Sequence, residues 1–136
     1  TVSFRLAEGR AVSAVDYLRA RRDSTALSAE VDQGLRDIDV FISGTTPSVA
    51  RPLTEVDAND ESYKYWNTRY SRNTVIGNLL GLCGISVPCG FSPRGLPIGL
   101  MIHAKARDEA MALRAAFAFE AATEWHKQRP DLSFCE

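Results

Sequence analysis

The side chains that could form a nucleophile and its base in this sequence are cysteines and histidines. Cys83 and Cys89 could act as thiolates, with His103 or His126 taking up the proton. A reactive thiolate is favoured by a helix start or a cationic neighbour, and neither follows either cysteine in the sequence. Two of the three cysteines lie in or beside apolar, strand-like runs, so we interpret all three, Cys135 included, as reduced structural thiols.

Residue types found in metal sites and phosphate loops are also present, but their spacing is wrong for those functions. Cys83, Cys89 and His103 lack the short paired spacing of a structural zinc site. The glycines that bound residues 90–95 are spaced as in a phosphate loop, but Leu-Pro follows them where such a loop has Lys-Ser. No lysine precedes a Ser/Gly-rich segment, so a Ser-Lys hydrolytic centre cannot be assembled from this sequence. We therefore expect no metal and no cofactor, and we predict that His103 is a core or rim histidine.

Composition and charge indicate an ordinary globular protein. The 136 residues are 45% hydrophobic and 24% charged. The formal net charge is -1, from 16 basic and 17 acidic residues, which provides no field that would gather nucleic acid or an anionic membrane. No apolar run reaches the ~20 residues of a bilayer-spanning helix, and no secretory signal is visible. We expect a cytoplasmic protein without nucleic-acid or membrane partners.

The hydrophobic pattern predicts helices alternating with strands. Ser13 and Asp16 have the spacing of a capping box, and apolar residues recur behind them at intervals of three and four. Short apolar runs without alternation are typical of strands covered on both faces. The predicted elements are a helix at 13–34, a strand at 39–43, a long surface loop with an aromatic end at 48–70, a helix at 72–82, strands at 84–88 and 97–102, and a helix at 108–129.

The order of these elements predicts the α/β class. A strand, a helix and a strand in succession predict two parallel strands joined by a right-handed crossover, and the strand at 97–102 is predicted to return antiparallel. The last helix is predicted to pack on the sheet through Ala110, Leu113, Phe117, Ala121 and Trp125. The length allows one core, so we predict a single domain over 1–136. Its sheet, of at least three strands, is predicted to be a piece of a larger one because its outer edge would be unpaired.

Several segments, taken in order, resemble the amidase-signature hydrolases. The resemblance is clearest at 78–101, Asn-Leu-Leu-Gly-Leu-Cys-Gly-Ile-Ser-Val-Pro-Cys-Gly-Phe-Ser-Pro-Arg-Gly-Leu-Pro-Ile-Gly-Leu-Met, which is similar to the C-terminal signature of that family. Residues 39–47 and 72–78 are similar to the strand, loop and helix that precede this signature in the family. Three positions depart from the family pattern. The family commonly has proline at the positions of Gly44 and Cys83, and glutamine at the position of Met101.

This resemblance implies that the chain is the C-terminal piece of the family's mixed sheet, with about three strands covered by helices. The family cleaves carboxamides with a Ser, cis-Ser, Lys triad in a Gly/Ser-rich segment upstream, and no such segment occurs in this sequence. We therefore predict that the chain contains no catalytic group and that the upstream catalytic part is missing. The start at Thr1, without an initiating Met, fits a fragment or a processed product, and removal of an initial Met before Thr1 would give the same start.

The resemblance also implies that the chain forms part of the wall around the acyl group of a small amide substrate. The residues that it places nearest to the substrate are Thr45, Thr46, Arg72, Thr74 and Asn78. Thr45 follows the C-terminal end of a predicted strand, where α/β sheets tend to bind ligands. Arg72 has a structural alternative, which is an ion pair with Asp57 or Asp60. Asn78 also has one, and we favour it: the side chain would hold backbone amides in place.

Within the family we favour a general amidase over the A subunit of aspartyl- or glutamyl-tRNA amidotransferase. The amidotransferase usually has an acidic residue just before the Thr of the helix, where this chain has Ser71, Arg72 and Asn73. The alternative from another class is a non-catalytic binding or assembly module, because aromatic side chains are natural anchors for a partner. The aromatic residues in question are Tyr63, Tyr65, Trp66 and Tyr70. A homo-oligomer is also compatible with the sequence.

Overall fold

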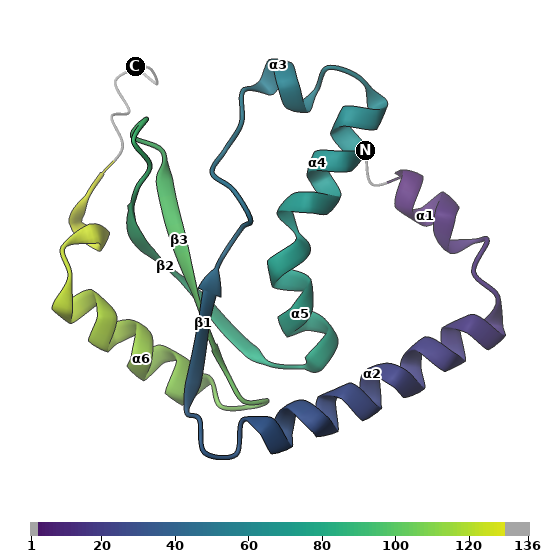
Figure 1. Ribbon diagram of the computed structural model, residues 1–136, viewed down its shortest axis with the longest axis horizontal. Helices are drawn as coiled ribbons and strands as arrows, with labels where there is room; N and C mark the ends of the chain where they lie inside the picture. The colour runs from purple at the N-terminus through teal and green to yellow at the C-terminus, as the bar shows by residue number, and fades with distance from the viewer. Residues whose placement is uncertain (1–2, 130–136) are drawn as a thin grey trace.

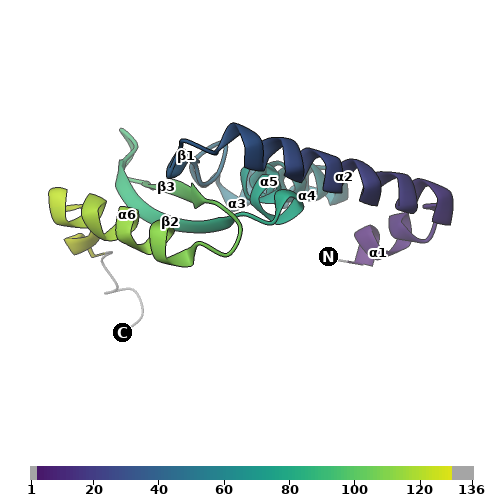
Figure 2. The same cartoon turned by 90° about the horizontal axis from the view of Figure 1, so that it is seen from below.

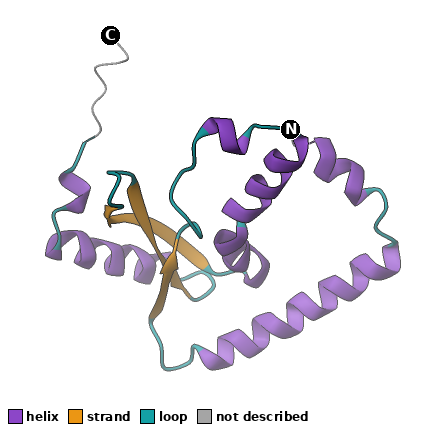
Figure 3. Ribbon diagram, turned by 45° about the horizontal axis from the view of Figure 1, so that its top comes forward, coloured by secondary structure: helices purple, strands orange, loops and turns teal. Residues whose placement is uncertain are grey.

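The computed structural model describes residues 3–129, which contain a three-stranded sheet and helices on both of its sides (Figure 1). In chain order the elements are α1 (Ser3–Gly9), α2 (Ala14–Gly34), β1 (Val40–Gly44), α3 (Leu53–Val56), α4 (Asp60–Tyr70), α5 (Arg72–Leu80), β2 (Cys83–Phe91), β3 (Pro97–Ala104), α6 (Glu109–Ala122) and the 3-10 helix η1 (Trp125–Lys127). α1 and α2 form an arm that extends away from the sheet (Figure 2). The sheet lies between α6 and the α4–α5 pair (Figure 3).

β3 is the central strand, and the order across the sheet is β1-β3-β2. Both neighbours pair with β3 in the antiparallel direction, so Ile42 and Ile85 lie on either side of Ile102. β1 and β2 therefore run in the same direction, but the predicted parallel pair does not form because β3 lies between them. The short connection at 92–96 closes β2 and β3 into a hairpin, and the free edge of β3 then pairs with β1.

Helix α6 covers one face of the sheet and forms the core with it. Ala112 and Ala116 are 4% exposed, and Ala116 packs with Val87 and Ile102. Alanine at the contact allows the helix to come close to the strands, where larger side chains from the sheet fill the space between them.

The apolar stripe predicted for α6 is wrong. Its four residues in α6 are exposed, namely Ala110, Leu113, Phe117 and Ala121. The fifth, Trp125, lies in η1 and does contact the sheet, with its ring centroid 6.2 Å from that of Phe91 in β2. α6 is apolar on more than one face, so periodicity alone could not decide which face packs on the sheet.

Helix α2 confirms its predicted limits and its cap. Ser13 precedes it, and Ser13 Oγ accepts a hydrogen bond of 3.1 Å from the Asp16 backbone N–H. No residue of α2 is buried. One of its links to the rest of the fold is a hydrogen bond of 2.9 Å from Ser24 Oγ to the Leu79 carbonyl oxygen on α5. α2 is therefore specified by local signals and has little packing within residues 3–129.

The prediction of a long surface loop at 48–70 is wrong, because α3 and α4 lie within it. Asn59 caps α4, and its Oδ1 accepts a hydrogen bond of 2.9 Å from the Ser62 N–H. Asp60 and Glu61 follow in the first turn, where the helix dipole favours negative charge. The polar run that suggested a loop is in fact a helix start.

The last helix is shorter than predicted. Asp108 caps its start, with Oδ1 accepting a hydrogen bond of 3.2 Å from the Met111 N–H. α6 ends at Ala122, and η1 forms a separate turn beyond it. Cys135, which we predicted to be a reduced thiol, lies outside the described residues. Cys83 and Cys89 are free thiols, as predicted. No helix among residues 3–129 is both long enough and apolar enough to cross a membrane.

Candidate functional site

The sheet face opposite α6 carries most of the polar side chains of the strands. Alternate residues of a strand point to opposite faces, and residues directly paired across strands share a face. The register therefore places Ser43, Met101 and Ser86 in one row on this second face, while Ile102 in the adjacent row points to the α6 core. This face is the one on which a polar ligand could be held.

Two hydroxyl groups meet across β3 where β1 ends. Thr45 Oγ1 lies 2.6 Å from Ser86 Oγ, and the Thr45 N–H donates a hydrogen bond of 2.9 Å to the Gly99 carbonyl oxygen. Gly99 lies beneath the two hydroxyls, and a Cβ there would be 2.7 Å from Thr45 Oγ1 and 2.9 Å from Ser86 Oγ. Cβ atoms do not approach other atoms so closely in real proteins. The hydroxyl bridge therefore depends on the absence of a side chain at position 99.

Helix α5 holds the same end of β1 from the other side. Asn73, in the first turn of α5, donates a hydrogen bond of 2.7 Å from Nδ2 to the Gly44 carbonyl oxygen. Together with the hydroxyl bridge, this bond fixes the end of β1 between β2 and α5. We call Thr45, Ser86, Gly99 and Asn73 the β1 clamp.

His103 lies deeper on the same face and is a core residue, as predicted. Its side chain is 3% exposed, and its ring stacks on Phe41 with ring centroids 4.6 Å apart. Burial lowers the pKa of His103 below its usual value, so the ring is neutral at neutral pH. Gly77 and Gly84 lie beside the ring, where a Cβ on either would be 3.5 Å from His103 Nδ1, an ordinary van der Waals contact.

The contact of His103 with Ser43 has the residue types of a nucleophile and a base. Ser43 Oγ lies 3.4 Å from His103 Nε2. However, Nδ1 has no hydrogen-bond partner among the described residues, so no third group orients the ring for catalysis. His103 is buried and Ser43 is half-buried, and we therefore interpret the pair as structural.

The other predicted substrate residues make local contacts or none. Thr46 Oγ1 donates a hydrogen bond of 2.8 Å to the Ser48 carbonyl oxygen, and Thr74 Oγ1 donates one of 3.0 Å to the Ser71 carbonyl oxygen. Asn78 is exposed on α5, and its side chain forms no hydrogen bond within the described part of the chain. The bond to backbone that we expected of Asn78 is made by Asn73, and its acceptor is a carbonyl oxygen.

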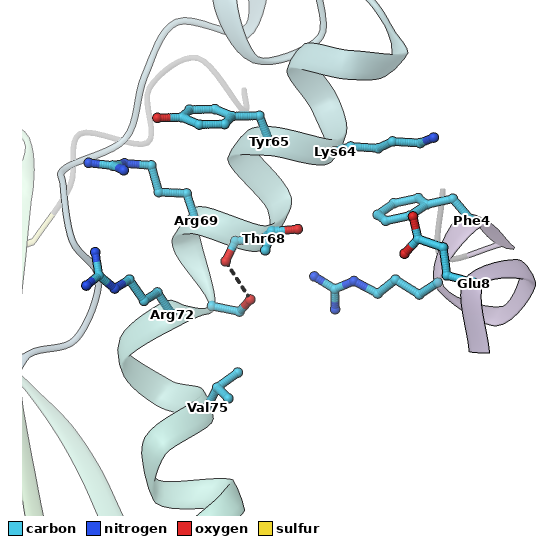
Figure 4. A pocket seen from close by; sticks show the side chains of 10 residues that line it. Phe4, Glu8, Lys64, Tyr65, Thr68, Arg69, Arg72 and Val75 are labelled. Carbon is cyan, nitrogen blue, oxygen red and sulfur yellow. Dashed lines mark hydrogen bonds between the residues drawn. The ribbon is translucent and has the colours of Figure 1, made fainter. Parts of the chain in front are cut away.

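Arg72 lines an open groove of about 810 Å³ between α1 and the α4–α5 pair (Figure 4). Neither of the ion pairs that we considered for it, with Asp57 or with Asp60, is present. Arg72 follows Ser71 at the junction of the two helices and precedes Asn73 of the β1 clamp. The groove and the clamp are therefore neighbouring features.

The aromatic residues of α4 pack mainly on one another. Trp66 lies 5.1 Å from Tyr65 and 5.8 Å from Tyr70 between ring centroids, and the Arg51 guanidinium lies 4.8 Å from the Trp66 ring. Tyr65 is 55% exposed and also lines the groove. The remaining rings are half-buried, which limits the surface that they offer to a partner.

Comparison with known proteins identifies the family. The model of one family, described as Amidase, matches residues 1–113. The chain belongs to the amidase family. Among curated members, the A subunit of the glutamyl-tRNA(Gln) amidotransferase of Gloeobacter violaceus is 38% identical over 117 residues. The match covers 86% of this chain and 23% of that relative, so the chain spans about a quarter of the relative's length.

Solved structures of amidase-family fold agree with this assignment. An alanine variant of the allophanate hydrolase of Kluyveromyces lactis has a TM-score of 0.72 and 25% identity, covering 89% of this chain and 20% of that chain. The A subunit of the glutamyl-tRNA(Gln) amidotransferase of Thermotoga maritima has a TM-score of 0.71 and 25% identity. This match covers 94% of our chain and 27% of the Thermotoga chain. The sheet and helices of this chain are therefore a partial amidase-signature fold.

Three residues of the β1 clamp were missed by the sequence predictions. Ser86 lies inside the predicted strand at 84–88, between Ile85 and Val87, which both pack in the core. This alternation would have assigned Ser86 to the polar face had the strand not been predicted to be covered on both faces. Gly99 and Asn73 had no comparable signal, because their roles depend on β3 lying beside β1 and on α5 lying against its end.

Proposed function

We propose that the chain is the C-terminal part of a hydrolase that cleaves carboxamide C–N bonds, and that it supplies the wall of the acyl pocket. Its membership of the amidase family supports the reaction type. The observation that supports its role most directly is the β1 clamp, in which the 2.6 Å hydroxyl bridge and the Asn73 bond hold the end of β1 in one position. A wall held in this way would keep an acyl group oriented for attack.

In this proposal, Thr45 and Thr46 at the end of β1 contact the acyl group. Arg72, Thr74 and Asn78 of α5 line the adjoining part of the pocket. Ser86 bonds to the Thr45 hydroxyl and Asn73 bonds to the Gly44 carbonyl oxygen, so both hold the end of β1 in place and are positioning residues.

The nucleophile and its base are proposed to come from the upstream part of the enzyme. Amide hydrolysis needs a nucleophile within hydrogen-bond reach of a base, and donors for the oxyanion. Within residues 3–129, Cys83 and Cys89 have no histidine partner, and the Ser43–His103 pair lacks an orienting group. We therefore expect this chain to bind and orient substrate without activating a nucleophile.

A second candidate is the A subunit of a transfer-RNA amidotransferase, which is favoured by the name of the Gloeobacter relative. The absence of a carboxylate at Ser71, Arg72 and Asn73 argues for a general amidase instead. Ammonia transfer to aminoacylated transfer RNA by the complete gene product would decide for the second candidate.

The proposal is tested by ammonia release from small carboxamides. The complete gene product is expected to hydrolyse them, and the 136-residue chain alone is expected to show no turnover. Turnover by the chain alone, or no hydrolysis of any carboxamide by the complete protein, would contradict the proposal.

The role of the clamp is tested in the same assay with Thr45→Val. The substitution removes the hydroxyl bridge but keeps the side-chain shape, so we expect KM for a small amide to rise about three- to tenfold. Thr25→Val is the matched control, because the Thr25 hydroxyl bonds only within α2, to the Arg21 carbonyl oxygen. Equal effects of the two substitutions would remove the clamp from the proposed site.

A further inference from the structure

Helix α5 has one buried residue, and that residue lies against the ring of His103. Gly77 is buried, whereas Val75, Ile76 and Leu79 of the same helix are exposed. A Cβ on Gly77 would lie 3.4 Å from His103 Cε1 and 3.5 Å from His103 Nδ1. Glycine therefore brings the helix backbone directly against the imidazole ring, and α5 rests on the sheet at this ring.

The elements around the ring of His103 offer no carboxylate. The ring has neutral neighbours on β1, β2 and α5, namely Phe41, Ser43, Gly84 and Gly77. Strands β1, β2 and β3 and helix α5 contain no acidic residue. Besides His103, their titratable or charged side chains are two thiols and one exposed cation, those of Cys83, Cys89 and Arg72. A positive charge on the ring would therefore have no counter-ion on these elements.

The ring also has no acceptor for a second N–H group. A neutral imidazole carries one N–H, and Ser43 Oγ, 3.4 Å from Nε2, can accept it. A protonated imidazole carries an N–H on both nitrogens, but Nδ1 is buried without a hydrogen-bond partner among residues 3–129. An unpaired donor and an uncompensated charge are both strongly disfavoured in a buried place. A proton on His103 is therefore stable only where the ring reaches water.

Of the elements around the ring, α5 is the one that can move. β1 and β2 are both paired with β3, so neither can leave the ring without loss of its ladder. α5 is tied to the sheet by the bond from Asn73 to the Gly44 carbonyl oxygen. Gly81, with a left-handed φ of 69°, ends α5 and joins it to β2. Hinges are formed by such residues at the ends of elements, which absorb the change in backbone angles.

We propose that His103 makes the seating of α5 on the sheet dependent on pH. Protonation of the ring lifts α5 from the sheet about Gly81 and breaks the bond between Asn73 and Gly44, while the core between the sheet and α6 stays intact. The β1 clamp is thereby opened in acid. This movement rests on the structure alone; its consequence for substrate, that acid disassembles the acyl wall, rests on the proposed function.

Amide hydrogen exchange of the 136-residue chain at pH 7.5 and 5.5 tests the movement, with each rate divided by the intrinsic rate of exchange at that pH. A histidine in water titrates near about 6.5, so the population of the opened form rises up to about tenfold between these pH values. We expect the protection of the α5 amides to fall by that factor and to be insensitive to low concentrations of urea, as local opening is. Unchanged protection of α5 would overturn the proposal. So would exchange of α5 and β3 with the same protection and the same urea dependence, because the opening would then be global.

Three variants assign the effect to the ring. His103→Phe is expected to abolish the fall in protection of α5, and a fall that persists would overturn the proposal. His126→Phe is the matched control, because His126 is the other histidine of the chain and lies in η1; loss of the effect in this variant would also contradict the assignment. Ser43→Asp places a carboxylate beside Nε2, so the protonated ring gains a counter-ion while α5 stays seated. We expect this variant to keep its α5 protection at pH 5.5, and a loss equal to that of the wild type would count against the proposal even if His103→Phe does not fold.

Turnover of a small carboxamide by the complete gene product separates this inference from the proposed function. A KM that rises more between pH 7.5 and 5.5 in the wild type than in His103→Phe supports the opening of the acyl wall. Hydrolysis with the same pH dependence of KM in both proteins would overturn that consequence while the amidase function stood. If no carboxamide is hydrolysed but the exchange of α5 still depends on His103, the movement of α5 stands and the proposed function fails.

Discussion

The sheet with α6 and the arm formed by α1 and α2 differ sharply in how they bury apolar side chains. In β3, Met101, Ile102, His103 and Ala104 are all buried. In α2, which is 21 residues long, no residue is buried. Large apolar side chains of the arm are instead exposed: Leu6, Val12, Val15, Tyr17, Leu18 and Leu27. The first region has a buried core, although Leu113 and Phe117 of α6 are also exposed, whereas the second has an apolar surface that nothing in residues 3–129 covers.

This difference shows that secondary structure and tertiary packing have separate sources in this chain. α2 forms because Ser13 caps it and because its sequence suits a helix. Isolated helices are marginal in water, and in proteins most of their stability comes from packing of the apolar face. We propose that the upstream part of the enzyme covers the arm, since the chain spans 23% of its Gloeobacter relative.

The largest expected effect comes from truncating the core of the sheet. Ile102 is 3% exposed and packs in the cluster with Val87 and Ala116, so Ile102→Ala is expected to lower the free energy of unfolding of the 136-residue chain by about 2–5 kcal/mol. Leu18→Ala in α2 is the control, because Leu18 is 54% exposed, and its effect is expected to stay within about 0.5 kcal/mol. Urea unfolding of both variants measures the difference. Equal losses would show that the arm is packed as well as the sheet.

A smaller effect is expected from closing the space beneath the hydroxyl bridge. Gly99→Ala places a Cβ 2.7 Å from Thr45 Oγ1, and the displacement is expected to cost about 1–3 kcal/mol of unfolding free energy. Gly34→Ala at the end of α2 meets no atom within 4 Å and is expected to be neutral or to stabilise by less than about 1 kcal/mol. The same unfolding experiment tests both. A harmless Gly99→Ala would mean that the clamp does not hold β1 tightly.

The smallest effect concerns pH and involves His103. Burial lowers its pKa in the folded chain, whereas the unfolded chain titrates near the ordinary value of about 6.5. As the pH falls below that value, the unfolded state takes up a proton that the folded state does not, so the stability of the fold decreases. His103→Phe keeps an aromatic ring against Phe41 and is expected to flatten this dependence. Urea unfolding at pH 7.5 and 5.5 makes the comparison, and an unchanged pH dependence in the variant would contradict the assignment to His103.

The elements with strong local signals were predictable from the sequence. The capping box at Ser13 and the apolar runs before Gly44 and Pro88 were enough to locate α2, β1 and β2. Strand pairing was not predictable in the same way, because it depends on which free edge the returning hairpin meets. The polar residues around Asn59 led to the prediction of a loop, because a helix N-cap followed by an acidic first turn has the same polar composition as a surface loop.

The candidate site was predictable only in part. The resemblance to the family pointed to Thr45 and Arg72, and the structure places one in the β1 clamp and the other in the adjoining groove. Ser86, Gly99 and Asn73 are distant in sequence from Thr45, and only the fold brings them together. All five predicted substrate residues, Thr45, Thr46, Arg72, Thr74 and Asn78, remain predictions, and Thr74 and Asn78 have no contact with the clamp.

Hydrogen–deuterium exchange of the 136-residue chain and of the complete gene product tests the central claim most directly. We expect the amides of β3 to be protected in both proteins, because β3 is paired on both sides and four of its residues are buried within this chain. We expect the amides of α2 to exchange rapidly in the chain alone and to become strongly protected in the complete protein, where the upstream part covers the arm. Equal protection of α2 in the two proteins would contradict the claim that this chain is one part of a larger hydrolase.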